Sequence, residues 1–240
     1  MKIKFLPILL LTVLFTSCKK HQLASTTGCK IASIIDSTYG IYEPEKLYVI
    51  KYELIYDNSG KLNKLLMAGL SETERDFSYA NNYIYIMTTH TDHRQYNDTT
   101  ILNNNGLIDS TIITDPLQGR IINKYNYDST GRIISVISGV VDYNTGVLTN
   151  IDSSQFIWLN GNMIRSNSMS YVYTNNTEQA ADYTLLINQY LVMGAYYYKS
   201  KNLLDMGGTY SFDDNGNVIE MYRVDPTRGY QDLRYTYICK

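Results

Sequence analysis

The cluster of side chains that best suits a metal ion is His90-Thr91-Asp92-His93. The chain has only three histidines in 240 residues, and two of them lie here. Alternate residues of a strand share a face, so His90 and Asp92 would point one way and His93 the other. Zinc takes three or four ligands, and no third strong ligand is marked nearby. We therefore expect a solvated hairpin tip at this point, no metal site and no cofactor.

A second group of oxygen-rich residues repeats along the chain as an aromatic residue, Asp, two polar residues, Gly, a polar residue and an aliphatic one. A calcium loop of the EF-hand type needs an oxygen ligand five residues before its Gly and a Glu six residues after it. Ile55 occupies the first of these positions around Gly60, and Tyr222 occupies the second around Gly216. The pattern therefore fails as a calcium site.

The same spacing is typical of a hairpin turn. Asp opens a type I turn and accepts a backbone N–H two residues on, while Gly three residues later adopts the left-handed conformation. The residues that we expect to form such turns are Asp57 with Gly60, Asp128 with Gly131, and Asp213 with Gly216.

Signatures of catalysis are missing from the sequence. There is no Gly-x-Ser-x-Gly elbow and no Gly-rich phosphate loop between a strand and a helix. Paired carboxylates for glycoside hydrolysis meet only in space, so a dispersed hydrolase site stays open as the third-ranked hypothesis. We expect no catalytic residues and no enzymatic activity.

The elements that must carry these residues are strands. The chain contains 24 Tyr against 5 Phe and 1 Trp. Tyr favours strands, and it suits a sheet with a wet face because its ring is apolar and its hydroxyl is polar. Together with the recurrent turns, this predicts an all-β fold: a long antiparallel meander of hairpins, curled into a half-open or closed barrel-like sheet.

One stretch has helical spacing. Apolar residues at Tyr183, Leu186, Ile187, Tyr190 and Leu191 predict one amphipathic helix near 177–193, which Gly194 would end. We expect this helix to cover an open end or face of the sheet, with a partner-binding role as the alternative.

The N-terminus carries an export signal. Met1 to Lys4 is a short basic start, and an apolar run follows from Phe5 to Phe15. Thr16-Ser17-Cys18 completes the pattern of a bacterial lipoprotein signal, in which the cysteine is lipidated and becomes the new N-terminus. We therefore expect a signal peptide at 1–17, a lipid-anchored tether at 18–28 and a single antiparallel β domain at 29–240. The lipid at Cys18 would hold the exported chain on the outer membrane, on a face that the sequence leaves open.

Two cysteines remain after Cys18 is assigned to the lipid. Cys29 lies at the start of the first expected strand and Cys239 at the end of the last. If these strands are antiparallel neighbours, the two residues meet at one edge and a disulfide is possible in an oxidising compartment. The alternative is two unrelated thiols near the ends of the domain.

The charge of the chain argues against a nucleic-acid partner. Of the 21 basic residues, Lys2 and Lys4 fall in the signal peptide, so the mature chain carries 19 against 23 acidic residues. A mildly acidic protein has no electrostatic attraction to phosphates. The expected partners are the membrane, through the lipid, and a glycan or an envelope protein.

The tyrosines suggest one binding hypothesis. Exposed rings in the second half of the chain would form a platform on which sugars stack. Its residues would be Trp158, Tyr196, Tyr197, Tyr198 and Tyr210, with further tyrosines at 171, 173, 235 and 237. The alternative is that these rings alternate between the core and a wet face of the sheet.

Two resemblances follow from these motifs. The block from Tyr127 to Ile133 resembles the YD repeat of Rhs-type proteins, although three copies at irregular spacing do not make an array. The whole layout, including Ser200-Lys201-Asn202-Leu203, is similar to a group of uncharacterised Bacteroides-type outer-envelope lipoproteins. That resemblance implies a porin-like or half-barrel β-meander and no activity. The leading functional hypothesis is a non-catalytic structural or interaction module of the cell envelope, with a glycan-binding lipoprotein as the alternative.

Overall fold

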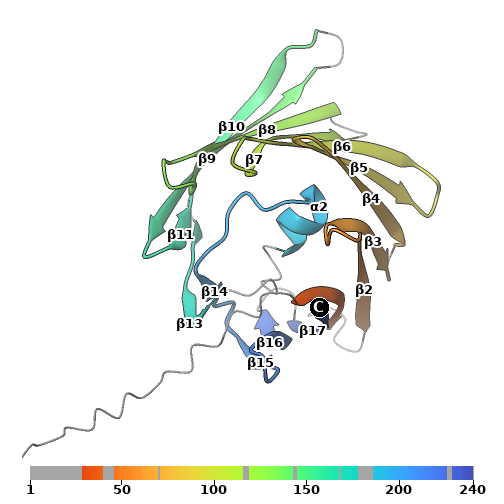
Figure 1. Cartoon of the computed structure of the whole chain (residues 1–240), viewed down its shortest axis with the longest axis vertical. Helices are drawn as coiled ribbons and strands as arrows, with labels where there is room; N and C mark the ends of the chain where they lie inside the picture. Colours follow the sequence, from red (N-terminus) through yellow and green to blue (C-terminus); the bar gives the residue numbers. More distant parts are fainter. Residues whose placement is uncertain are drawn as a thin grey trace, which may run out of the picture.

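The computed structural model describes residues 29–39, 46–69, 71–115, 119–142, 145–167, 169–177, 186–225 and 229–239. One antiparallel sheet of 15 strands dominates it (Figure 1). The strands of this sheet are β1 (Cys29–Tyr39), β2 (Leu47–Tyr56), β3 (Leu62–Ala68), β4 (Thr73–Ala80), β5 (Tyr83–His90), β6 (Gln95–Leu102), β7 (Ile108–Asp115), β8 (Gly119–Tyr127), β9 (Ile133–Val141), β10 (Leu148–Leu159), β11 (Asn162–Ser166), β12 (Met169–Ser170), β15 (Gly208–Phe212), β16 (Val218–Asp225) and β17 (Gly229–Cys239).

The strands form a meander, and the last part of the chain returns to pair with the first strand. Strands β1 to β12 are neighbours in sequence order, and β17, β16 and β15 extend the sheet on the other side of β1. The two edges are β12 and β15, which do not pair with each other in the described part of the chain. A separate pair, β13 (Tyr173–Thr177) and β14 (Asn202–Leu204), continues the chain from one edge and leads into the other. The predicted long antiparallel meander is therefore confirmed, and the sheet is curled and open.

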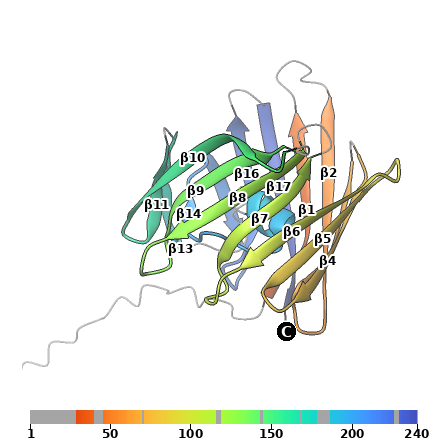
Figure 2. The ribbon, with the colours of Figure 1, turned by 90° about the horizontal axis from the view of Figure 1, so that it is seen from above.

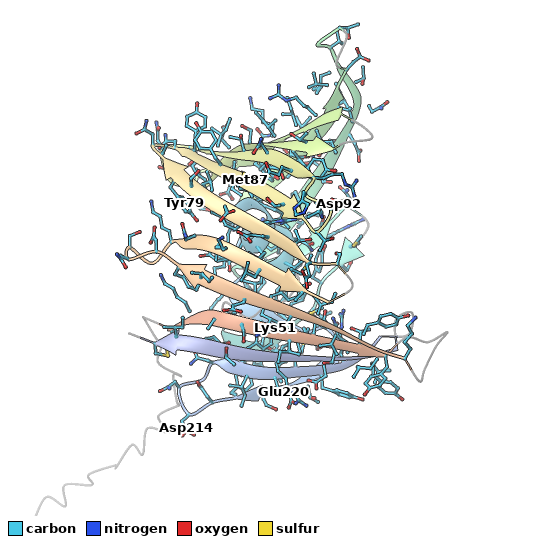
Figure 3. All side chains as sticks on the ribbon, turned by 90° about the vertical axis from the view of Figure 1, so that its right-hand side faces the viewer. Lys51, Tyr79, Met87, Asp92, Asp214 and Glu220 are labelled. Carbon is cyan, nitrogen blue, oxygen red and sulfur yellow. A yellow bond between two sulfur atoms is a disulfide. The ribbon has the colours of Figure 1, made fainter. Side chains whose placement is uncertain are left out.

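Alternation along the strands decides which side chains face the inside of the curl. In β2, Tyr52 and Leu54 are buried while Lys51, Glu53 and Ile55 are exposed. Figure 3 shows Lys51 and Glu220 among the side chains of the outer face. The main inner core joins residues from both ends of the chain: Ile31, Ile34, Tyr52, Leu54, Leu62, Leu65, Phe77, Ile84, Ile86, Leu186, Leu191, Leu203, Val218, Met221, Leu233 and Tyr235.

The helical segment is short and lies inside the curl. Residues Leu186–Tyr190 form one turn of π-helix (η1), and Leu191–Met193 form α2, which ends at Gly194 with φ of 71°. The sequence predicts a helix near 177–193, but residue 177 ends strand β13 and residues 178–185 lie outside the described residues. Its position agrees with the expectation that it covers a face of the sheet: the segment lies within the curl, where Leu186 and Leu191 join the core on the inner face (Figures 1 and 2).

A half-buried arginine, Arg75, holds this segment against the sheet. The Arg75 guanidinium donates from Nη1 to the carbonyl of Leu191 at 3.1 Å. Burial lowers the pKa of Arg75, with Asp98 acting in the opposite direction. The contact also satisfies a carbonyl at the end of the helix that has no partner within it.

The hairpin turns have the geometry that their sequences predict. Asp128 Oδ1 accepts the backbone N–H of Thr130 at 2.9 Å and that of Arg132 at 3.0 Å. Gly131 follows in the left-handed region with φ of 81°. Asp57 and Asp213 accept backbone N–H groups four residues on in the same way, at 2.9 and 2.8 Å. Gly60 and Gly216 have φ of 81° as well.

We expect Gly131→Val to lower the free energy of unfolding by about 1 kcal/mol or more, because a β-branched residue is strained at positive φ. A Cβ at this position meets only Leu107 Cδ1 at 3.6 Å, so the backbone conformation and not crowding causes the loss. Chemical denaturation of both proteins measures it. Gly131→Asn is the matched control, since Asn tolerates this conformation. An equal loss in the Asn variant would contradict the explanation.

Acid should weaken the same turn. The Thr130 hydroxyl and the Arg132 backbone N–H hold the pKa of Asp128 below its ordinary value of 3.8. The contribution to stability is fully present above the unfolded pKa, and it is lost as the pH falls from about 5 through the lower pKa of the folded state. Asp128→Asn removes this titration and keeps the acceptor, as Asn103 does in its own turn, where it accepts from Asn105 and Leu107. We expect the melting temperature of this variant to fall less between pH 5 and pH 2 than that of the unmodified protein.

Asp214→Asn is the control for that measurement, because Asp214 is exposed at another hairpin (Figure 3). It should leave the acid dependence unchanged. Equal flattening by both variants would show that the effect is one of net charge and not of the turn.

The first and last strands of the sheet are joined. β1 and β17 pair antiparallel with Cys29 opposite Cys239. Their Cα atoms are 4.0 Å apart and their sulfur atoms form a disulfide across 210 residues of sequence. Cys18, the signal peptide at 1–17 and the tether at 18–28 lie outside the described residues.

Candidate functional site

His90, Asp92 and His93 each have different neighbours in the structure. His90 packs edge-on against Tyr96, with ring centres 5.5 Å apart. Asp92 pairs with Arg94 at 2.5 Å, and His93 occupies the turn itself with φ of 62°. Figure 3 places Asp92 at the end of the β5–β6 hairpin. Among the residues that the structure describes, no group of three His, Cys, Asp or Glu side chains is arranged to hold a metal ion.

The most distinctive cavity lies inside the curled sheet, and we call it the luminal pocket. Its volume is about 350 Å³. Strands β8 to β11 contribute one wall, and the segment from Asn188 in η1 through α2 to Tyr198 contributes the other. After α2 this segment crosses the inside of the curl (Figure 1). The described lining residues are Asn123, Tyr125, Val136, Ser154, Phe156, Met163, Ser166, Tyr171, Asn188, Gln189, Met193, Tyr197 and Tyr198.

Aromatic rings form much of the lining. Tyr197 packs against Tyr125 with centres 5.0 Å apart and planes tilted by 37°, and against Tyr198 at 5.2 Å and 65°. Trp158 supports Tyr198 from outside the pocket, with planes at 77°, and its indole N–H donates to the Ile133 carbonyl at 2.7 Å. In each of these three contacting pairs the ring planes are tilted or edge-on, and none of the three is stacked in parallel.

Burial keeps the phenols of Tyr125 and Tyr197 neutral. It raises the pKa of both groups, because the ionised form loses solvation. Both hydroxyls therefore stay protonated over the whole physiological pH range. The Tyr125 hydroxyl donates to Met193 Sδ at 3.6 Å. The neighbouring Tyr125 and Tyr171 raise the pKa of Tyr197 further.

Gln189 organises the wall that crosses the curl. Its side chain is 1 % exposed, and its Oε1 accepts the backbone N–H groups of Tyr197 at 2.7 Å and of Tyr198 at 3.2 Å. Because Oε1 accepts both of these hydrogen bonds, Nε2 is the group of this side chain that is left to donate. Nε2 makes no hydrogen bond with the described residues, although Gln189 lines the pocket. Nε2 keeps access to the pocket, where water or a ligand can accept its hydrogen bonds.

Other polar groups of the pocket are also unpaired. The Asn188 side chain is exposed and, like the hydroxyls of Ser166 and Tyr197, forms no hydrogen bond within the described part of the chain. Asn123 differs, because it donates to Thr111 at 3.0 Å and accepts from Ser138 at 2.7 Å. The pocket therefore combines ring faces with several free hydrogen-bonding groups, and no charged side chain is present among its described lining residues.

Only part of the predicted sugar platform comes together. Tyr197, Tyr198 and Trp158 form one cluster, but it is inside the sheet and its rings are not coplanar. Tyr196 instead stacks on Tyr190 at 5.0 Å. Tyr210 packs against Phe212 and donates to the Leu204 carbonyl at 2.8 Å. The five rings therefore do not form one surface.

The sequence analysis missed Tyr125 and Gln189. Tyr125 and Tyr127 are two residues apart on β8, so strand alternation places both rings on the inward face of the sheet. Gln189 follows the buried Leu186 by three positions, so helical spacing places a polar residue on the apolar face of the helix. A polar residue in such a position is the signal that could have identified it.

Comparison with known proteins gives a fold and no family. No family model matches the chain, and no curated protein matches it. A porin-like protein from Bacteroides uniformis is similar in structure, with a TM-score of 0.54 and 12% sequence identity over 87% of this chain and 98% of that one. A porin-like protein from Bacteroides vulgatus has the same identity and coverage at a TM-score of 0.32. The all-β, open-meander fold of this chain is therefore similar to that of the Bacteroides uniformis porin-like protein, at a sequence identity that supports a likeness of fold alone.

Proposed function

We propose that this chain is an exported, lipid-anchored protein of the cell envelope that binds a small uncharged molecule in the luminal pocket and carries out no chemistry on it. The observation that carries the proposal is the unpaired Nε2 of Gln189 in a ring-lined pocket. Small-molecule sites are usually concave and combine aromatic or apolar side chains with a few polar groups that fix the orientation of the ligand.

The lining chemistry supports binding rather than catalysis. Amides, hydroxyls and rings orient a ligand, whereas hydrolysis of a glycoside needs two carboxyl groups on opposite sides of the bond. The described lining residues contribute no carboxyl group. The free donors are therefore better explained as groups that hold a ligand in place.

The envelope location rests on the sequence. The signal ending at Cys18 motivates the lipid anchor. No helix of the described residues is both long and apolar enough to cross a membrane. In this proposal the residues at 18–28 link the acyl group on Cys18 to the β domain.

The anchor is tested by Cys18→Ala in the full-length chain. We expect the unmodified protein to fractionate with membranes, to begin at Cys18 and to carry a diacylglycerol mass there, and the variant to keep residues 1–17 and to lack that mass. An unmodified protein without an acyl mass on Cys18, or a variant cleaved at the same position, would overturn the anchor.

The binding function is tested by a thermal-shift survey of the full mature chain in detergent. The compounds are neutral sugars, amino acids, nucleosides, sugar acids and fatty acids. We expect at least one uncharged compound to stabilise the fold, with a shift that decreases when Asn188 is replaced by Ala. A survey in which no class shifts the melting temperature would overturn the proposed function.

A further inference from the structure

The lining of the luminal pocket indicates the chemical class of its ligand. On the basis of the proposed function, we infer that this pocket holds a single pyranose ring of a neutral sugar, either free or at the end of a glycan. The inference comes from four features of the pocket: its size, the angles between its rings, its unpaired donors and the chemistry of its described lining.

The size favours one small ring. A volume of about 350 Å³ is at the lower end of the range for ligand sites, roughly 300–1,000 Å³. A single sugar ring with bound water suits such a space better than an acyl chain or a peptide segment. The wall formed by Tyr197 and Tyr198 is fixed through their N–H groups to Gln189, so the pocket is largely formed before binding.

The ring angles disfavour a flat ligand. Tyr125 and Tyr197 meet at 37°, and Tyr197 and Tyr198 meet at 65°, so neither pair forms a parallel slot for a nucleobase or another aromatic molecule. A pyranose is puckered, and the C–H groups on one of its faces are apolar. Such a face fits against one tilted ring while the rim of the sugar meets its neighbours.

The unpaired polar groups require a ligand with several hydroxyls. Gln189 Nε2, the Asn188 amide and the hydroxyls of Tyr197 and Ser166 have no partner among the described residues. An alkyl chain would leave these groups desolvated and unpaired, at a cost of roughly 1–3 kcal/mol for each buried one. Sugar hydroxyls both donate and accept, so one ring can satisfy several of them at once.

The described lining also gives no charge to match an ionised ligand. It contains no Lys, Arg, Asp, Glu or His. Moving a carboxylate or phosphate out of water without a counter-charge is unfavourable. A uronic acid or a sugar phosphate should therefore bind more weakly than the neutral sugar of the same ring.

Two variants test the inference without disturbing the wall. Tyr197→Phe removes one hydroxyl and keeps the ring and the backbone N–H that Gln189 binds. Asn188→Ala removes an exposed amide that holds nothing else in the described structure. The matched control is Tyr83→Phe, because Tyr83 is 41 % exposed on the outer face and stacks there on Tyr85.

The experiment is calorimetric titration of the full mature chain, in detergent, with methyl glycosides of glucose, galactose, mannose and N-acetylglucosamine. Glucuronic acid, adenosine and decanoic acid are titrated in parallel. We expect one neutral pyranoside to bind, and Tyr197→Phe and Asn188→Ala each to raise its Kd about three- to tenfold. Tyr83→Phe should leave the Kd unchanged.

The results of these titrations test the sugar class and the pocket function separately. If a charged sugar, adenosine or decanoic acid binds instead and the two pocket variants weaken it, the pocket function stands and the sugar class is overturned. If a pyranoside binds with equal affinity to all variants, the site assigned here is overturned. If no compound of any class binds, both the ligand class and the pocket function are overturned.

Discussion

Replacing both Cys29 and Cys239 by serine is expected to lower the free energy of unfolding by about 5 kcal/mol. The disulfide closes a loop of 210 residues, and the chain-entropy model gives roughly this value for a loop of that length. The two residues are also register partners at the ends of β1 and β17, the pairing that joins the N-terminal and C-terminal parts of the sheet. Urea denaturation of a form that begins at Thr26, and so lacks Cys18, measures the loss.

The unmodified protein under reducing conditions is the matched control for that double variant. It should lose the same stability, whereas the variant should be insensitive to reductant. Two alkylatable thiols in the non-reduced, unfolded chain would contradict the disulfide. Equal stability of the variant and the oxidised protein would show that the β1–β17 ladder holds the ends together without it.

The second large effect is expected for Leu191→Ala, at about 3 kcal/mol of unfolding free energy. Leu191 is 1 % exposed and lies where α2 contacts the main core inside the curl. Truncating a fully buried leucine removes its transfer free energy and leaves a cavity, which together cost roughly 2–5 kcal/mol. The same truncation at Leu159, which is 55 % exposed, is the control and should cost well under 1 kcal/mol.

Leu191→Ala also probes how the helical segment supports the pocket. The segment continues into Tyr197 and Tyr198, so loosening it should expose their rings. We expect tyrosine fluorescence to become more accessible to acrylamide in the Leu191 variant at temperatures where the sheet is still folded. Loss of sheet and ring protection in one transition would show that the segment and the sheet unfold as a single unit.

Local chemistry explains why the turns were predictable. The turn at Asp128 and Gly131 depends on one carboxylate, two backbone N–H groups and one positive φ, all within five residues. Nothing distant is needed, so the pattern in the sequence is sufficient. The C-terminal stop of the helix at Gly194 was predictable for the same reason, because a glycine in the left-handed conformation ends a helix locally.

The site was less predictable. The alternation of side chains along a strand shows on which face of the sheet a residue lies, but it does not show which distant residues that side chain contacts. Strand alternation allows Tyr196, Tyr197 and Tyr198 to be imagined as one surface, yet these residues lie in an irregular segment and not in a strand. There each ring takes a different partner: Tyr190 for Tyr196, Tyr125 for Tyr197 and Trp158 for Tyr198.

By itself, then, the sequence determined the antiparallel hairpins, their turns and the inward or outward side of most strand residues, since these depend on contacts a few positions apart. Only the tertiary structure decided that β17 returns to β1, that the helical segment lies inside the curl, and that Gln189 and Tyr125 face one pocket. These features depend on the curvature of the whole sheet and on pairs separated by tens to hundreds of residues. Curvature accumulates from small twists between many strands, and no short stretch of sequence encodes it.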